Sequence, residues 1–379
     1  TDPVIMAAHF QMTNDIDVLG SRCYPIGSVA SPFTGVFDGN GFSIRNLELQ
    51  STGQSPLGLF ACIAGDAAEI RDLRLSVPVV SGYNGYVGGL VGHLESGGLH
   101  HCEVDNGRIS STKPVVGGLV GIASKSAVIH DCRASVSVKG THTVGGLVGR
   151  NQADVRNCQV RGMVIGEQIV GGLAGQNEGA ISKCSSQVSL YAEDIMGGLA
   201  GKNTKNGQIE SCSVRGQIWG SSYLGGLSGQ SAGSICDSYS LSSLSGSDHI
   251  GGLVGGLGME EPTDPNKAND SDKDDQQQLL LNCYAAGAIS GRTCMGGLVG
   301  SGWTGEVIQC LWDAEVTGMD RMCGQQTDTL FLDKDSNGAS TAAMQIAETF
   351  AAIGWLGTSS HEHCVWTIQT DSYPKCAWE

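Results

Sequence analysis

Residues 145–171 read GGLVGRNQADVRNCQVRGMVIGEQIVG, and this stretch contains the pattern that decides the fold. It begins with a pentapeptide at Gly145 and ends where the next copy begins. Between the copies, Cys158 follows Val155 by three residues, Val160 follows two residues later, and Val164 lies inside Gly-Met-Val-Ile-Gly. Alternation of this kind between glycines predicts short strands joined by tight bends. Three such strands and bends use about 26 residues, which is one coil of a three-sided solenoid.

The pentapeptide Gly-Gly-Leu-(Val/Ala/Ser)-Gly occurs eight times, and a degenerate copy precedes these at residues 57–61. The first glycines of the eight copies are Gly88, Gly117, Gly145, Gly171, Gly197, Gly225, Gly251 and Gly296. The copies are 26 to 29 residues apart, except for a last interval of 45. A fixed period of this length is typical of solenoids, because each unit buries its apolar face only by stacking on its neighbours.

A cysteine recurs at one position of the repeat, three residues after an Ile, Val or Leu. These residues are Cys102, Cys132, Cys158, Cys184, Cys212, Cys283 and Cys310. In one coil, Ser238 occupies this position. In the first two coils, the position three residues after Ile44 and Ile70 is occupied by Leu47 and Leu73. A position that accepts Leu or Cys is an inward, apolar one. We therefore predict a single inner row that runs from Leu47 to Cys310, with one side chain per coil.

The composition agrees with a thin core rather than a thick globular one. The chain has 57 Gly among 379 residues, and aromatic residues make up only 6%. Glycine costs about 1 kcal/mol in a helix interior, so this density disfavours helices. The predicted fold class is all-β: a parallel β-solenoid of about ten three-sided coils with a cap at each end.

The repeat also divides the chain. Residues 1–55 are predicted to form the N-terminal cap and first coil, residues 56–310 the solenoid, and residues 311–379 the C-terminal cap. One short amphipathic helix is expected within the C-terminal cap, over residues 341–354. Residues 258–278 are acidic and poor in apolar side chains, which predicts a loop that leaves one corner of the rod.

The charge of the chain excludes some partners. Its formal net charge is −16, and nucleic acid is therefore not an expected partner, because binding it requires Lys and Arg against the phosphates. No apolar run reaches the roughly 18 residues of a transmembrane helix, so no membrane span is expected. We expect a secreted protein, located outside the cell or on its surface.

The pentapeptides, together with the pairs Asp131-Cys132, Asn157-Cys158 and Asn282-Cys283, resemble the GLUG-motif repeats of secreted bacterial proteins. This resemblance covers most of the chain and implies the solenoid fold. It also implies a place among adhesin-like surface proteins, some of which carry protease domains of the immunoglobulin-A-cleaving kind. The metal-binding sequence His-Glu-x-x-His of such proteases does not occur here.

The 14 cysteines allow two arrangements. The seven cysteines of the inner row are predicted to be reduced, buried thiols, although thiols one coil apart also lie within the range for a disulfide. Outside the row, Cys364 with Cys376 and Cys310 with Cys323 are the candidate disulfides. The sequence predicts no cofactor other than a calcium ion. A candidate calcium loop contains Asp333, Asp335 and Asn337, but it lacks the acidic residue at its twelfth position.

No convergent set of catalytic side chains recurs in the repeat, so we expect no enzymatic activity. The leading hypothesis is a structural or adhesive protein, whose partners are a second copy at its coil ends or extracellular glycans and proteins. The alternative is a glycan-binding or polysaccharide-degrading β-helix. Its candidate contacts are the aromatic side chains Trp219, Tyr223 and Trp303.

Overall fold

One coil of the computed structural model shows how the repeat becomes structure. Strand β20 (Ile169–Gly171) is followed by β21 (Ala174–Asn177), β22 (Ala180–Ser182) and β23 (Ser185–Tyr191), and the chain then reaches the level of the next coil at β24 (Ile195–Gly197). Each strand pairs in parallel with its counterpart one coil away. The structure describes residues 2–53, 56–83, 85–112, 114–258, 279–326, 331–334, 336–355, 366–369 and 372–379.

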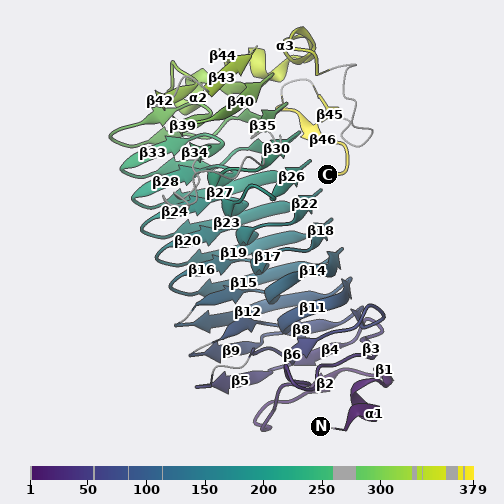
Figure 1. Ribbon diagram of the computed structural model, residues 1–379. Helices are drawn as coiled ribbons and strands as arrows, with labels where there is room; N and C mark the ends of the chain where they lie inside the picture. The colour runs from purple at the N-terminus through teal and green to yellow at the C-terminus, as the bar shows by residue number, and fades with distance from the viewer. Residues whose placement is uncertain are drawn as a thin grey trace, which may run out of the picture.

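The strands form three parallel sheets, of which two run the length of the rod and the third spans its middle part (Figure 1). Sheet A has 20 strands, usually two per coil. They are β1 (His9–Gln11), β3 (Val36–Asp38), β6 (Phe60–Ile63), β7 (Glu69–Arg71), β11 (Val91–His100), β14 (Val120–His130), β17 (Val148–Asn151), β18 (Asp154–Arg156), β21, β22, β25 (Ala200–Asn203), β26 (Gln208–Glu210), β29 (Ser228–Ser231), β30 (Ser234–Cys236), β34 (Val254–Leu257), β35 (Leu279–Leu281), β39 (Val299–Gly302), β40 (Gly305–Ile308), β42 (Cys323–Gln326) and β43 (Phe331–Lys334).

Sheet B has 16 strands, and twelve of them follow one another from β2 to β44, so the chain makes about eleven turns. The strands are β2 (Ile16–Asp17), β4 (Ser43–Arg45), β5 (Glu48–Ser51), β8 (Arg74–Ser76), β9 (Val79–Gly82), β12 (Glu103–Ser111), β15 (Arg133–Lys139), β19 (Gln159–Ile165), β23, β27 (Ser213–Trp219), β31 (Tyr239–Ser240), β32 (Ser243–Ser245), β36 (Tyr284–Ala285), β37 (Ile289–Ser290), β41 (Leu311–Asp313) and β44 (Asn337–Ala339).

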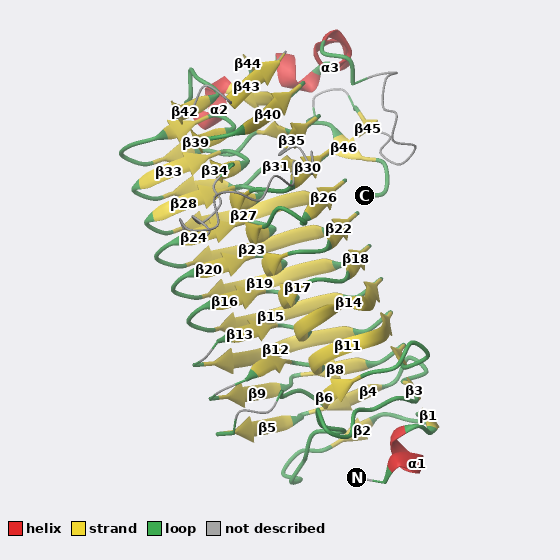
Figure 2. Ribbon diagram, in the orientation of Figure 1, coloured by secondary structure: helices red, strands yellow, loops and turns green. Residues whose placement is uncertain are grey.

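Sheet C is the narrowest, with eight strands that each end in the first glycines of a pentapeptide. They are β10 (Tyr86–Gly88), β13 (Val115–Gly117), β16 (Thr143–Gly145), β20, β24, β28 (Ser222–Gly225), β33 (Asp248–Gly251) and β38 (Met295–Gly296). These sheets confirm the predicted all-β parallel solenoid. Helices are few and short, and Figure 2 shows them at the two ends of the rod.

The core is a narrow column of side chains from all three sheets, because alternate residues of each strand point inward. Within β23, for example, Val188 and Leu190 are buried and the residues beside them are exposed or half-buried. The seven cysteines of the repeat lie in this column, each at most 1% exposed. Stacking therefore buries what a single coil could not.

A left-handed residue precedes each of these cysteines, at the corner between sheets A and B. Asn157 has φ 54° and Asp131 has φ 57°, and the same conformation recurs at Asp72, His101, Lys183, Ser211, Asp237, Asn282 and Gln309. Asn and Asp tolerate this conformation better than most residues do. This requirement explains why Asn or Asp so often precedes the cysteine of the repeat.

A second inner ladder consists of buried amides, which the sequence analysis missed. Asn151 donates from Nδ2 to Oδ1 of Asn177 over 2.9 Å, Asn177 does the same to Asn203 over 2.9 Å, and Asn203 donates to Oγ of Ser231 over 3.1 Å. All four side chains are fully buried. Each lies six residues after the first Gly of a pentapeptide, so the sequence did contain the signal.

The N-terminal end of the inner row differs from the prediction. Arg74 donates its backbone N–H to the carbonyl of Phe42, as Glu103 does to Leu73 and Arg133 does to Cys102. Phe42, and not Leu47, therefore precedes Leu73 in the row. Leu47 instead accepts from the N–H of Val79, one corner later.

The physical reason is an enlarged first corner. Phe37 pairs with Ile70 on the next coil. Phe42 follows Phe37 by five positions, whereas Leu73 follows Ile70 by only three, so the first corner contains two more residues. Asn46 then takes a left-handed conformation at the next corner, with φ 60°. Asn46-Leu47 therefore imitates the Asn-Cys pairs of the later coils, although it occupies a different corner.

The stacking continues beyond the expected boundary at residue 310. Strand β43 pairs with β40, and β44 pairs with β41, so residues 331–339 contribute to one more coil. Beyond them, the expected helix is divided into a 3₁₀ turn (Ala343–Gln345) and helix α3 (Ala347–Ala352), separated at the extended Ile346. Helices α1 (Pro3–Met6) and α2 (Ala314–Thr317) were not predicted. Residues 259–278 of the expected acidic loop lie outside the described residues.

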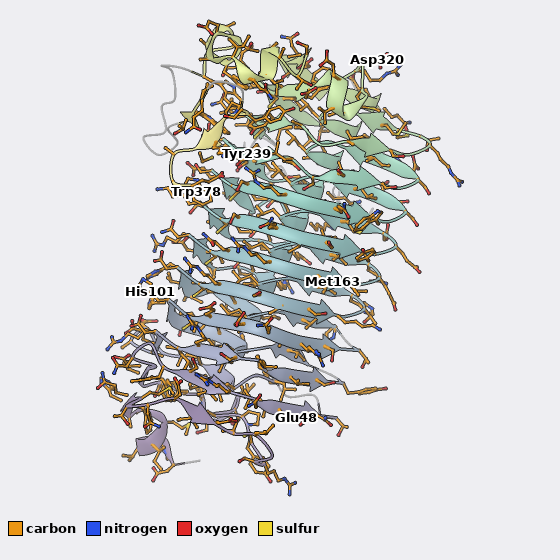
Figure 3. All side chains as sticks on the ribbon, turned by 180° about the vertical axis from the view of Figure 1, so that it is seen from behind. Glu48, His101, Met163, Tyr239, Asp320 and Trp378 are labelled. Atoms are coloured by element: carbon orange, nitrogen blue, oxygen red, sulfur yellow. The ribbon has the colours of Figure 1, made fainter. Side chains whose placement is uncertain are left out.

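The C-terminal segment packs against the outer side of sheet B. Tyr239 and Tyr284 stack on adjacent coils, with ring centroids 4.9 Å apart, and the C-terminal side chains Phe350, Trp355, Trp366 and Tyr373 surround Tyr284. The hydroxyl of Tyr239 donates to Glu379 over 2.7 Å, and Figure 3 shows Tyr239 close to Trp378. Strands β45 (Trp366–Thr367) and β46 (Lys375–Cys376) form an antiparallel pair within this segment.

Candidate functional site at the corner between sheets B and C

The corner between sheets B and C gathers two of the three aromatic residues that the sequence suggested as contacts. Trp219 ends β27, and Tyr223 lies in β28, four residues later. Trp303, the third, lies between β39 and β40 on sheet A, where it is 43% exposed. The structure therefore separates Trp303 from the other two.

Trp219 forms a stacked pair with Tyr191 of the preceding coil. The two residues are in register at the ends of β27 and β23, with ring centroids 4.7 Å apart and ring planes 13° apart. Tyr191 is 38% exposed, so the pair presents an aromatic surface to solvent. Stacked, accessible rings of this kind can contact an apolar face of a ligand.

Tyr223, His249 and Cys294 occupy one position on three consecutive coils. Their neighbours are in register, Leu224 with Ile250 and Ile250 with Met295. All three have left-handed backbones, with φ of 50°, 53° and 51°. Residues at the same position in earlier coils, such as Ile169 and Ile195, do not share this conformation. A departure of this kind is a reason to look for function at these three residues.

Polar contacts connect these residues. Oδ2 of Asp248 lies 2.9 Å from Nδ1 of His249, and the Oγ1 of Thr293 donates to Oδ1 of Asp248. The ring of Tyr223 stacks on His249, with centroids 4.5 Å apart. On the other side, the thiol of Cys294 donates to Oε1 of Gln325 in β42 over 2.9 Å.

The electrostatics of this corner favour a carboxylate beside a neutral thiol. Burial opposes ionisation of Asp248, but hydrogen bonds from Thr293 and Cys294 and the charge of His249 hold its pKa below the usual value. Burial and the Asp248 carboxylate raise the pKa of Cys294. A nucleophilic cysteine needs a lowered pKa, so this thiol is not activated for nucleophilic attack.

The sequence analysis assigned no role to Cys294, His249 or Asp248. A signal existed, because Tyr223, His249 and Cys294 each lie two residues before the first Gly of a pentapeptide. The interval of 45 residues between His249 and Cys294 obscured it.

Another polar cluster lies at the corner between sheets A and B, farther toward the N-terminus. The rings of His100 and His130 are 3.9 Å apart, and Nδ1 of His130 lies 2.6 Å from Oδ2 of Asp131. His101 lies 3.7 Å from Asp72 and 3.8 Å from Asp131, and Figure 3 shows it at the margin of the rod. The imidazoles thus join a network of carboxylates along the corner.

The candidate disulfides are only partly within the described residues. Cys310 and Cys323 are free thiols, which corrects their expected pairing. Cys310 faces the core and donates to the carbonyl of Ile308, whereas Cys323 is paired with Val299 in sheet A. Cys364 lies outside the described residues, so its pairing with Cys376 stays a prediction.

The thiols of the inner row also act as hydrogen-bond donors. Cys184, for example, donates to the carbonyl of Ser182 over 3.2 Å and lies 3.7 Å from the carbonyl of Val155. Burial raises the pKa of Cys132, Cys184 and Cys283, so these thiols stay protonated.

Two of the three candidate calcium residues lie in strands. Asp333 pairs with Val307 in β43, and Asn337 pairs with Leu311 in β44. Between them, Ser336 takes the place of the repeat cysteine, because its Oγ accepts from the N–H of Cys310 over 3.2 Å. This stretch forms a corner of a further coil, and Asp335 lies outside the described residues.

Comparison with known proteins agrees with the repeat. Residues 140–165 match the model of the GLUG motif. Halomucin from Haloquadratum walsbyi is 30% identical over 137 residues, which are 34% of this chain and 1% of halomucin. A proposed Gly-rich membrane protein from Evansella cellulosilytica is 30% identical over 155 residues, 38% of this chain and 18% of that protein. The chain thus spans only a small part of either relative.

Among solved structures, a proposed immunoglobulin A1 protease from Bacteroides ovatus is similar over 98% of this chain and 86% of its own, with a TM-score of 0.43 and 16% identity. Within the described residues, no helix has the length and apolar character needed to cross a membrane. Residues 140–165 therefore carry the GLUG motif, within a chain whose strands stack as a parallel β-solenoid.

Proposed function

We propose that the chain is a non-enzymatic structural or adhesive rod of the cell exterior. The observation that carries this proposal is the unbroken stacking of rungs from β2 to β44, supported inside by the cysteine and asparagine ladders. Twelve rungs at a spacing of about 4.8 Å give a rod roughly 50 Å long. Such a rod supplies reach and stiffness, and its corners are free to vary.

The burial of the repeat thiols is compatible with a location outside the cell. The seven cysteines of the repeat are inaccessible to solvent, so an oxidant outside the protein does not easily reach them. The matches to halomucin and to a proposed Gly-rich membrane protein are consistent with this location. The net charge of −16 keeps a long rod soluble and disfavours binding to anionic surfaces.

The rod ends suggest how copies would associate. Among the described residues, β1 pairs only with β3, and β42 and β43 pair only with β39 and β40. Each end therefore presents a strand edge, and head-to-tail contact between such edges produces filaments.

Negative-stain microscopy and sedimentation of the purified chain test the structural proposal. We expect unbranched rods, which lengthen into filaments as the concentration rises. The protein should leave polysaccharide and peptide substrates intact during long incubation. Cleavage of either substrate would contradict the non-enzymatic proposal, and compact particles without any rod would contradict the structural one.

The aromatic pair at the corner between sheets B and C favours glycan binding as a second candidate. Tyr191 and Trp219 offer two parallel rings to solvent, which suits the apolar face of a sugar. Binding to a panel of extracellular polysaccharides tests this role. We expect Trp219→Ala to weaken binding about 10-fold or more and Trp303→Ala, on sheet A, to leave it unchanged. Equal effects of both variants would exclude this corner as the contact.

A further inference from the structure

We propose that Asp248, His249 and Cys294 form a binding site for a divalent transition metal ion of the zinc type. A carboxylate oxygen, an imidazole nitrogen and the thiol sulfur of these residues all lie within 4.8 Å of one another. Cys, His and Asp are the side chains that zinc prefers, whereas calcium takes oxygen ligands. The proposal does not depend on the adhesive role argued above.

The distances are close to those of a metal centre. Tetrahedral zinc, with bonds of about 2.0–2.3 Å, holds its ligand atoms about 3.3–3.8 Å apart. Oδ2 of Asp248 and Nδ1 of His249 are already 2.9 Å apart, and the widest separation in the set is below 4.8 Å. Shifts of about 1 Å in these half-buried side chains would bring the ligand atoms to the separations of a zinc site.

The surroundings supply a fourth ligand and an outer layer of contacts. Oε1 of Gln325 lies 2.9 Å from the sulfur of Cys294, and a water molecule is the alternative in an open zinc site. Thr293 donates to Asp248, which orients the carboxylate, and the ring of Tyr223 stacks on His249, which fixes the imidazole plane. Outer contacts of this kind are a regular feature of metal sites.

The backbone provides an independent indication. His249 and Cys294 take the left-handed conformation together with Tyr223, whereas residues at this position in earlier coils do not. This conformation is uncommon for Tyr and Cys and is maintained by the surrounding structure. His249 and Cys294 therefore occupy equivalent positions on adjacent coils, at the corner between sheets B and C.

The alternative of a cysteine nucleophile fits less well. The thiol of Cys294 donates its hydrogen bond to the amide oxygen of Gln325, and not to the imidazole nitrogen of His249 that would have to remove its proton. A bound metal ion would instead supply the positive charge that a carboxylate and a thiolate at one site require. It would also connect two coils whose ligands are 45 residues apart in the sequence.

Titration of the purified, metal-free chain with Co²⁺, observed by absorption, tests the proposal. We expect about one equivalent to bind with a thiolate-to-cobalt charge-transfer band, and Zn²⁺ to displace it. Cys294→Ser should abolish the band. His249→Asn, chosen because Asn tolerates the left-handed backbone, should weaken binding at least about 10-fold. Cys236→Ser, on the opposite corner, is the matched control and should retain both band and affinity.

Circular dichroism of each variant separates loss of the site from loss of the fold. Zn²⁺ should also raise the melting temperature of the unaltered chain and leave that of Cys294→Ser unchanged. The absence of a thiolate band, or a band that persists in Cys294→Ser, would overturn the proposal. Rod formation is measured separately, so failure here leaves the structural role untouched.

Discussion

Cys158 donates its backbone N–H to the sulfur of Cys184, 3.4 Å away on the next coil. Elsewhere in the row, an oxygen accepts the equivalent hydrogen bond. The backbone N–H of Cys212 donates to Oγ of Ser238 over 3.0 Å, and that of Cys310 donates to Oγ of Ser336 over 3.2 Å. In these coils the repeat position therefore holds a small side chain that accepts from the backbone of the neighbouring coil and donates to a carbonyl. Apolarity alone does not describe it.

Substitution at Cys184 tests this account. We expect Cys184→Ser to lower the free energy of unfolding by only about 1 kcal/mol, because the hydroxyl makes the same bonds. Cys184→Phe should cost more than about 3 kcal/mol, because the column is filled by side chains from adjacent coils. Urea denaturation measures both. Ser238→Cys completes the row and serves as a control of near-zero effect. A serine variant less stable than the phenylalanine variant would refute the account.

The asparagine ladder predicts a larger loss. Asn177→Ala removes the acceptor of Asn151 and the donor to Asn203, and it leaves both groups buried. We expect a decrease of about 2–4 kcal/mol in the free energy of unfolding. Asn177→Ser should cost about half as much, because Ser231 occupies this position one coil beyond Asn203. Equal losses for the two variants in urea denaturation would show that the ladder bonds contribute little.

Gly171 has no room for a side chain. A Cβ atom at this residue would lie 1.8 Å from the carbonyl oxygen of Ala174 and 2.6 Å from the backbone N of Gly201 on the next coil. We expect Gly171→Ala to destabilise the rod by more than about 3 kcal/mol, since backbone on two coils must move. Gly53→Ala is the control, because its Cβ meets only Oγ of Ser51 at 3.6 Å. The measurement is the melting temperature, and equal values for both variants would contradict the expectation.

The buried histidines predict loss of stability in mild acid. Burial lowers the pKa of His93, and burial followed by the charge of His130 lowers that of His100. The unfolded chain then binds more protons than the folded chain below about pH 6.5, so stability is complete above that pH and decreases as the pH falls. His100→Gln should reduce the decrease in melting temperature between about pH 7 and pH 5. His101→Gln is the control, because this side chain is 60% exposed, and it should leave the pH dependence of the melting temperature unchanged. An unchanged pH dependence in His100→Gln would rule out this residue as a cause.

The sequence determined the architecture because the period of the repeat and the alternation within strands are local properties. A pentapeptide every 26 to 29 residues sets the length of one coil, and the pair Asn157-Cys158 marks a corner and the inner position that follows it. The same reasoning failed at Leu47, where Asn46 produces an identical local signal at another corner. Local pattern cannot show how many residues the preceding corner contains.

Only the tertiary structure decided which distant side chains meet. His249 and Cys294 are adjacent because parallel pairing places β38 beside β33, although the two residues are 45 positions apart in the sequence. Tyr239 and Glu379, 140 residues apart, meet because the C-terminal segment returns along sheet B. The physical reason is that stacking fixes contacts through register between coils. Register depends on the length of every loop, whereas the repeat records only the strands.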